Sequence, residues 1–293
     1  MKEIKYSFII PHKNRPDLLQ RCVNSIPDRD DVQIIVVDDN SETAKKPCIV
    51  REGLEVVLLS SQQSKGAGHA RNVGLEYAKG EWLLFADADD YYNDGFLNIL
   101  DEYTKQKYDV IFFNFLYKEG KTGELLPKLR LQECFLNFDG SPSAIDEIKY
   151  YNKVPWSKMV SSRYVKMNNI HFEEVLNGND IYFSICVGRY ANKIAIEKAP
   201  LYVYLKNDNS IQTSKPTIKG ALCEVEHSIK LNNLYDFLGH PEWKGPCAKM
   251  ILSYMLKLGM PFFFSVLLRS ITWFKVRNEW IDSFKKAKTE LST

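Results

Sequence analysis

Short apolar runs alternate with helical patterns over the first 115 residues. Several of these runs are apolar at consecutive positions, which is typical of strands covered on both faces of a parallel sheet. We expect strands at residues 6–10, 32–37, 54–59, 81–86 and 108–115. Helical patterns lie between them, at about residues 14–26, 69–79 and 94–107. Strands separated by helices predict β-α-β units with right-handed crossovers, and therefore an α/β fold.

The pattern weakens after residue 118. Glycines and prolines mark turns in residues 118–153, for which we expect loops that cover or line a site. A helix is expected from Asp180 to Tyr190, with strands following near 194–196 and 202–204. Residues 215 to 293 have a mostly helical pattern. The sequence therefore predicts one domain over residues 1–213 and a helical C-terminal extension over residues 214–293.

Composition and charge exclude several classes of protein. Hydrophobic residues make up 45% and charged residues 26% of the chain, which is ordinary for a globular protein. The formal net charge of +2 is too small to indicate a nucleic-acid partner. The six cysteines include no C-x-x-C pair, which argues against a disulfide scaffold or a zinc site. No secretory signal precedes the first strand, so we expect reduced thiols and a cytoplasmic protein.

Carboxylates follow two of the expected strands directly. Asp38 and Asp39 come after the second strand, and Asp87, Asp89 and Asp90 come after the fourth. Because ligands bind beyond the carboxyl ends of the strands in open α/β sheets, both groups point to one crevice. Mg²⁺ or Mn²⁺, held by one or two carboxylates together with phosphate oxygens, fits this pattern. On spacing alone, the alternative is a helix cap or a solvated loop.

Four ordered motifs resemble the nucleotide-binding half of the family 2 glycosyltransferases, which have the GT-A fold. They lie at residues 7–15 (SFIIPHKNR), 36–41 (VVDDNS), 70–74 (ARNVG) and 80–90 (GEWLLFADADD). The resemblance continues through residues 154–158 (VPWSK), 177–183 (NGNDIYF), 200–204 (PLYVY) and 210–211 (SI). It covers about residues 4–213. It implies a mixed sheet flanked by helices, with a nucleotide-binding half at 1–115 and an acceptor half at 116–213.

The resemblance also implies an activity. It indicates a metal-dependent, inverting transferase that moves a hexose or an N-acetylhexosamine from a nucleotide-diphosphate sugar to an acceptor hydroxyl. In this family the donor is most often a UDP-sugar, and the cofactor is Mn²⁺ or Mg²⁺. The expected acceptor is an oligosaccharide or a lipid-linked chain in the synthesis of cell-surface polysaccharide.

Donor-site residues can be carried over by position. The resemblance places Asp39 at the nucleotide base, Asp87 at the ribose hydroxyls and Asp89 on the metal ion that bridges the two phosphates. Pro11 and Arg71 lie in the matching motifs and are expected near the nucleotide. From the residues alone, the alternative for Arg71 is a charge on a helix surface.

Asp180 matches the general base of the family. In a single in-line displacement, a carboxylate takes the proton of the attacking hydroxyl while the metal ion stabilises the departing diphosphate. The alternative for Asp180 is a helix N-cap. Trp156 and Lys158 match an acceptor-side segment, although a tryptophan in such a place is more often a packing residue.

Three departures from the family pattern concern the same site. His12 and Lys13 stand where the family more often has Thr-Tyr, which indicates different donor contacts near the first strand. Asn179 replaces the usual acidic residue before the base. Residues 65–68 (KGAG) resemble a glycine-rich phosphate loop but lack the full Rossmann spacing, and we interpret them as a turn before the helix that carries Arg71.

Two other functions share parts of this pattern. A nucleotidyltransferase that makes sugar nucleotides also has strand-end acids and a metal ion. It usually has a glycine-rich triphosphate-binding segment near the N-terminus, which residues 13–15 do not provide. A non-catalytic nucleotide-sugar-binding protein would keep the fold without needing intact acids at Asp87, Asp89 and Asp180.

The tail is both apolar and basic. Residues 251–268 are strongly apolar, but Lys257 and Pro261 interrupt them, so we expect no membrane-spanning helix. Aromatic residues follow, interleaved with Arg269, Lys275, Arg277, Lys285, Lys286 and Lys288. This pattern favours peripheral binding to an anionic membrane surface on the inner face of the cell membrane. The alternative is a helical hairpin packed on the catalytic domain or on a second subunit, and the oligomeric state stays open.

Overall fold

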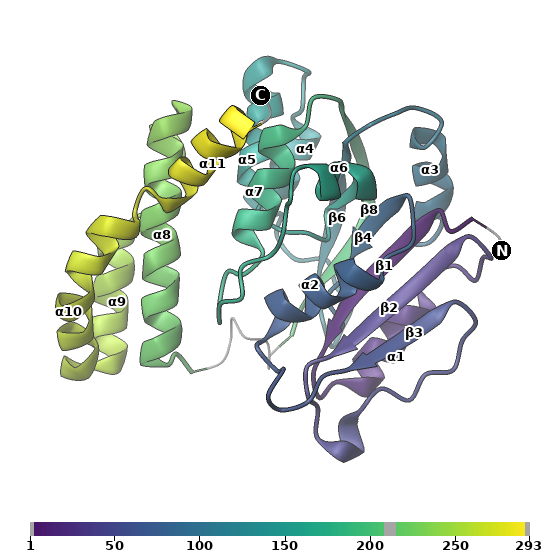
Figure 1. The fold of residues 1–293 in the computed structure, drawn as a ribbon, viewed down its shortest axis with the longest axis horizontal. Coiled ribbons are helices and arrows are strands. Elements are labelled where there is room, and N and C mark those ends of the chain that lie inside the picture. The colour runs from purple at the N-terminus through teal and green to yellow at the C-terminus, as the bar shows by residue number, and fades with distance from the viewer. Residues whose placement is uncertain (1–2, 208–214, 291–293) are drawn as a thin grey trace. The chain divides into compact units, whose positions relative to one another are not determined.

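The computed structural model describes residues 3–207 and 215–290, and the chain divides into two compact units (Figure 1). Met1–Glu174 and Asn179–Ser210 form the first unit, and Val175–Gly178 and Ile211–Thr293 form the second. The predicted boundary at residue 213 and the predicted motif at residues 210–211 both lie outside the described residues.

Within the described residues, the first unit is built on an eight-stranded mixed sheet of order β3-β2-β1-β4-β7-β6-β8-β5. The strands β1 to β4 pair in parallel, whereas β7 runs antiparallel to both β4 and β6. The predicted α/β fold with a mixed sheet is confirmed. The strands are β1 (Tyr6–His12), β2 (Val32–Asp38), β3 (Leu54–Leu58), β4 (Trp82–Phe85), β5 (Tyr91–Tyr92), β6 (Val110–Glu119), β7 (Lys158–Ser161) and β8 (Ile194–Lys206).

Helices cover both faces of the parallel half of the sheet. Alternate residues of a strand point to opposite faces, so Phe8 joins the core formed with α1 (Pro16–Asn24) and α3 (Phe96–Tyr103). On the other face, Ile9 lies against α2 (Ala67–Tyr77), which Figure 1 shows in front of β1. Phe85 packs there against Phe183 of α7 (Ile181–Tyr190). Burial on both faces explains why these strands are apolar at consecutive positions.

The second half of the sheet differs from the sequence-based expectation. Residues 118–153 contain α4 (Arg130–Leu136) and α5 (Pro142–Tyr151), where loops were expected. The start of α5 carries a conventional signal, since the Ser141 hydroxyl accepts a hydrogen bond from the Ala144 amide at 3.3 Å and a proline follows Ser141. The two strands expected near 194–196 and 202–204 form one strand, β8, whose pairing register with β6 shifts near Asn114. The short α6 (Ser162–Met167) was not predicted.

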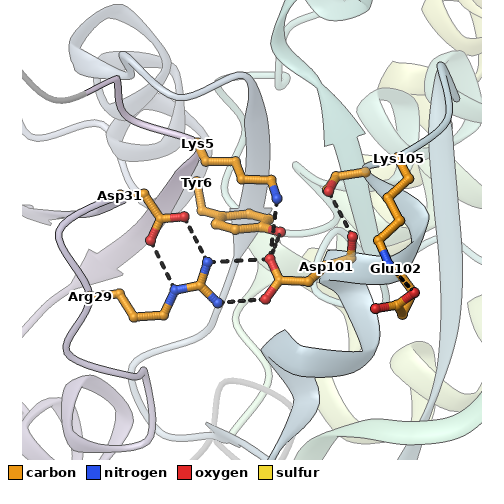
Figure 2. Close-up of polar contacts among 8 residues, drawn as sticks. Lys5, Tyr6, Arg29, Asp31, Asp101, Glu102 and Lys105 are labelled. Carbon is orange, nitrogen blue, oxygen red and sulfur yellow. Dashed lines mark hydrogen bonds and ion pairs between the residues drawn. The ribbon is translucent and has the colours of Figure 1, made fainter.

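A polar cluster joins the amino ends of β1 and β2 to α3 (Figure 2). The guanidinium of Arg29 donates to Asp31 at 2.7 Å and to Asp101 at 2.6 Å, and Asp101 also accepts from the Tyr6 hydroxyl and from Lys5. Although burial opposes it, these hydrogen bonds hold the pKa of Asp101 at about 2. The cluster lies at the amino ends of the strands, so we assign it to the stability of the fold.

The second unit is helical, as predicted. It contains α8 (Ile218–Leu238), α9 (Cys247–Leu258), α10 (Met260–Val276) and α11 (Glu279–Glu290). Residues from α8 and α10 form its core, and side chains of α9 pack against that core. Gly259, with a φ of 70°, separates α9 from α10, which divides the apolar stretch as Lys257 and Pro261 predict. Among the described helices, none has both the length and the apolar character that crossing a membrane requires.

Candidate active site

The carboxyl ends of β1, β2 and β4 meet at one edge of the sheet, because these strands are parallel neighbours. Pro11 of β1 stands in register with Val37 of β2, and Asp39 follows β2 by one residue. Asp87 and Asp89 follow β4 shortly after its end at Phe85. The predicted donor-site residues therefore lie at the edge where ligands of α/β sheets bind.

A buried hydrogen-bond network joins the loops that follow β1 and β2. His12 Nδ1 lies 2.7 Å from a carboxylate oxygen of Asp38, and both side chains are inaccessible to solvent. Because the backbone amide of Arg15 donates to His12 Nε2 at 3.0 Å, the ring proton sits on Nδ1 and is donated to Asp38. The Ser41 amide also donates to Asp38, and the Asn14 amide donates to the Ser41 hydroxyl. The first departure from the family pattern, His12, is therefore a residue that fixes the shape of the loop after β1.

The second departure, Lys13, forms an ion pair with Asp39. Lys13 Nζ lies 3.1 Å from Asp39 Oδ2, and the Gly66 amide donates to Asp39 Oδ1 at 3.3 Å. The carboxylate of Asp39 is buried, whereas Lys13 is half exposed. Asp39, the residue expected at the nucleotide base, thus has a cation beside it. The sequence showed that Lys13 departs from the family pattern, but it did not show that Lys13 pairs with Asp39.

Arg71 connects the end of β4 to the segment that begins α7. Its guanidinium donates to Asp87 Oδ1 at 2.6 Å and to Asn179 Oδ1 at 2.8 Å, and it lies over the Phe172 ring at 5.4 Å. The side chain is 6% exposed. The alternative of a surface charge is therefore wrong, and Arg71 holds residues from two distant parts of the sequence.

Gly68 allows this connection to form. A Cβ added at Gly68 would lie 2.1 Å from the carbonyl oxygen of Glu173 and 2.8 Å from the Cβ of Asn179. Only a residue without a side chain lets α2 approach so closely, and this approach brings Arg71 within reach of Asn179. Residues 65–68 thus form the turn and first residues of the helix that carries Arg71, in agreement with the interpretation from the sequence.

Asp180 occupies the N-cap position of α7, but its side chain makes no capping hydrogen bond to the helix. Burial, the largest cause, raises the pKa of Asp180, and the negative charge of Asp87 raises it further. The positive charges of Arg71 and Lys158 oppose this increase. A partly buried carboxylate that is not used as a cap, and whose pKa is raised, is chemically suited to accept a proton.

The three carboxylates after β4 have different surroundings. Asp90 is fully buried and accepts hydrogen bonds from the Leu205 amide at 2.8 Å and the Tyr202 hydroxyl at 3.0 Å. It therefore holds β8 against the loop after β4.

Asp89 is partly buried and accepts a hydrogen bond from the side-chain amide of Asn207 at 3.2 Å. Burial and then the neighbouring charge of Asp87 raise the pKa of Asp89, so a cation placed there would relieve both effects. In the part of the chain that the structure describes, no three His, Cys, Asp or Glu side chains are grouped to hold a metal ion.

Trp156 and Lys158, which were expected to contact the acceptor, are both buried. The Trp156 ring stacks on Tyr202, with ring centroids 4.8 Å apart, and belongs to the main core. Lys158 is inaccessible to solvent, and its Nζ donates to the Asn152 carbonyl at 2.9 Å. Burial holds the pKa of Lys158 well below its usual range, although the charge of Asp180 opposes this. In this structure neither side chain is exposed to an acceptor, because the segment is buried beside β6, β7 and β8.

Comparisons with known proteins agree with the fold and its motifs. The model of glycosyl transferase family 2 matches residues 7–172, which is more than half of the chain. The poly(ribitol-phosphate) beta-glucosyltransferase of Bacillus spizizenii is 28% identical over 79% of this chain and 38% of its own length. The poly(ribitol-phosphate) beta-N-acetylglucosaminyltransferase TarS of Staphylococcus aureus is 27% identical over 69% of this chain and 35% of its own length. The chain thus spans little more than a third of either relative.

A solved structure shows the same fold. The crystal structure of S. aureus TarS 1–349 in complex with UDP-GlcNAc superposes with a TM-score of 0.61 at 21% sequence identity. The match covers 97% of this chain and 80% of that one.

Proposed function

The chain belongs to glycosyl transferase family 2, and from this premise we propose that it transfers a hexose or an N-acetylhexosamine, with inversion, from a UDP-sugar to an acceptor hydroxyl. The observation that carries the proposal is the bridge made by Arg71 between Asp87 and Asn179. This bridge holds Asp87, which follows β4, near the segment that precedes Asp180. A donor site and a base are the two parts that a single displacement needs.

In the proposed reaction the acceptor oxygen attacks the anomeric carbon of the donor sugar. The bond from this carbon to the diphosphate oxygen breaks, and UDP leaves with the electron pair. Asp180 takes the proton of the attacking hydroxyl, so no separate nucleophile is required. Asp39 and Asp87 bind the nucleotide, Arg71 orients Asp87, and Pro11 lines the donor site from β1.

Asp89 fits a divalent cation in chemical terms. Its ligand atoms are carboxylate oxygens, which Mg²⁺ and Mn²⁺ prefer, and its pKa is raised by burial and by Asp87. We propose Asp89 as the protein ligand of Mn²⁺ or Mg²⁺, with Asp87 beside it. When bound, the ion would supply Lewis-acid stabilisation of the departing diphosphate.

Asp89→Ala is expected to remove the metal dependence of UDP binding. Titration calorimetry with and without Mn²⁺ should show that the wild-type chain binds UDP at least ~10-fold more tightly with the ion, a difference of about 1.4 kcal/mol. The variant should bind UDP equally weakly in both conditions. Asp94→Ala is the matched control, because Asp94 is an exposed acid in the same loop region and should retain the difference. A full metal effect in Asp89→Ala would show that the ion binds elsewhere.

The rate of transfer is expected to fall at low pH as Asp180 becomes protonated. Because burial raises the pKa of Asp180, the acidic limb of the pH–kcat profile should lie above the usual aspartate value of about 3.9. Asn179→Asp adds a carboxylate beside Asp180 with little change of shape, and it should move this limb to higher pH. A limb that stays in place or moves to lower pH would argue against Asp180 as the titrating base.

The acceptor we propose is a hydroxyl of a polyol-phosphate polymer or of a lipid-linked oligosaccharide in cell-surface polysaccharide synthesis. The relatives named for poly(ribitol-phosphate) support the first of these. We also propose that the chain works as a peripheral protein on the inner face of the membrane, close to a lipid-linked acceptor.

The release of UDP tests the proposed reaction. The chain is incubated with UDP-glucose, UDP-N-acetylglucosamine, UDP-galactose or UDP-N-acetylgalactosamine and Mn²⁺, with and without poly(ribitol-phosphate) or a lipid-linked oligosaccharide. UDP should appear from one donor and should increase with an acceptor. Release of pyrophosphate from UTP and a sugar 1-phosphate, with no UDP from any donor, would instead indicate a nucleotidyltransferase.

A further inference from the structure

The helix α10 carries apolar side chains on two opposite sides. On one side, Phe262 and Trp273 are buried in the core of the second unit, and Val266 and Val276 pack against that core. Phe262, Val266, Trp273 and Val276 recur every three, four or seven residues and thus share one face of the helix. This face accounts for the packing of α10 within the second unit.

The other side of α10 is a second apolar face exposed to solvent. We call it the α10 stripe, and it consists of Met260, Phe264, Leu267, Leu268, Ile271 and Phe274. These residues also recur at helical spacing, and each is more than half exposed, with Leu268 at 81% and Ile271 at 71%. Soluble proteins rarely expose a contiguous apolar patch of this kind, and such patches usually mark an interaction site. The stripe therefore lacks the covering that its composition requires.

The charge near the stripe is predominantly basic. Residues 243–278 contain six Lys or Arg residues and no Asp or Glu, although Glu279 and Asp282 follow directly. Two of the six are paired with acids of α8, since Arg269 lies 3.8 Å from Glu226 and Lys244 lies 2.8 Å from Asp236. Lys275 is exposed at the end of the stripe, and the guanidinium of Arg277 lies over the Phe274 ring at 4.2 Å. The side chains of Lys286 and Lys288, which the sequence pattern also included, lie outside the described part of the chain.

We propose that the α10 stripe inserts into the surface of an anionic membrane, with Lys275, Arg277 and neighbouring basic residues contacting lipid headgroups. Apolar side chains on one side of a surface helix and basic residues around them are the combination that binds such a surface. The inference goes beyond sugar transfer and does not depend on the donor site. It names the surface of the second unit that would contact the membrane in the proposed peripheral location.

Two other occupants fit the surface less well. A free polyanion such as a phosphodiester polymer would use the basic residues, but it would leave six large apolar side chains in water. A second copy of the chain, packed about a two-fold axis, would bury the stripe. It would also bring Lys275 and Arg277 of one copy toward the same residues of the other, and like charges that approach each other oppose association.

Vesicle sedimentation with the full chain and no nucleotide tests the inference. Phosphatidylcholine vesicles are compared with vesicles in which about a third of the lipid is phosphatidylglycerol. We expect binding to the anionic vesicles only. Leu268→Ser with Ile271→Ser should weaken it by about tenfold or more, since the lost area is apolar. Lys275→Gln with Arg277→Gln should weaken it by about fivefold for each charge removed.

The matched control is Val50→Ser with Met167→Ser, which removes two exposed apolar side chains from the first unit and should bind like the wild-type chain. Unchanged thermal unfolding of each variant shows that the fold is intact. Three results would overturn the inference. The first is equal binding to both kinds of vesicle. The second is normal binding by the Leu268/Ile271 variant, with a loss only in the Lys275/Arg277 variant. The third is a wild-type dimer that the Leu268/Ile271 substitutions dissociate, with no vesicle binding by either the wild-type chain or this variant. Because UDP release is measured separately, failure of one proposal leaves the other standing.

Discussion

Asp180→Asn is expected to reduce the rate of sugar transfer by at least ~10³-fold while leaving UDP affinity nearly unchanged. The amide has the shape of the carboxylate but cannot take a proton from the acceptor hydroxyl. Since the Asp180 side chain makes no capping bond to α7, the substitution should cost little stability. Single-turnover transfer and UDP titration, made on the same preparation, separate the two quantities.

Two results would contradict this assignment. Equal losses of transfer and UDP affinity would give Asp180 a role at the nucleotide. Full transfer by the variant would mean that another group accepts the proton. Asp146→Asn is a suitable control, because it makes the same chemical change on α5, outside the proposed site, and should leave transfer unchanged.

Arg71→Met is expected to impair both stability and transfer. The substitution keeps a long side chain but leaves Asp87 and Asn179 without the donors that they have at 2.6 and 2.8 Å. Breaking a fully buried ion pair costs about 3–5 kcal/mol, and because the Asp87 carboxylate is about a third exposed we expect a smaller loss, about 2 kcal/mol, in the free energy of unfolding. Misplacement of Asp87 and of the segment before Asp180 should lower kcat/KM by about 10²-fold.

Arg71→Lys distinguishes the geometry of Arg71 from its charge. A lysine keeps the charge but presents a single ammonium group, which cannot make the forked contact to both partners. We therefore expect Arg71→Lys to recover part of the stability and little of the transfer rate. Wild-type transfer by either variant would show that the bridge is not needed for the reaction. Chemical denaturation and initial-rate kinetics provide the two measurements.

The parallel half of the fold could be predicted because each of its strands contains at least three consecutive apolar residues. β7 could not, since it is four residues long and begins with Lys158, a buried charge that no local pattern indicates. Helices α4 and α5 were hidden by the glycines and prolines around them. The helix α4 has Leu129 before its first residue, and the Gln132 side chain satisfies the Leu129 amide at 2.8 Å.

Parts of the candidate site could also be predicted from the sequence, and other parts could not. Strand-end acids such as Asp39 and Asp87 can be placed from the sequence, because parallel strands bring their carboxyl ends together. The contact between Arg71 and Asn179 joins residues 108 positions apart and depends on a missing side chain at Gly68, so no local pattern could show it. In the tail, composition predicted an apolar and basic surface, but only the packing against α8 shows which apolar residues of α10 remain exposed.

A thermal-shift panel of UDP, GDP, dTDP and CMP, each with and without Mn²⁺, tests most directly whether this edge of the sheet is a UDP-sugar donor site. At about a hundred times Kd, a bound nucleotide should stabilise the fold by about 2.7 kcal/mol, which is readily measured. We expect a clear shift with UDP in the presence of Mn²⁺, a smaller shift with UDP alone, and little or none with the other nucleotides. A panel with no thermal shift would contradict the roles proposed for Asp39, Asp87 and Asp89. So would a shift of the same size for every nucleotide, with or without Mn²⁺.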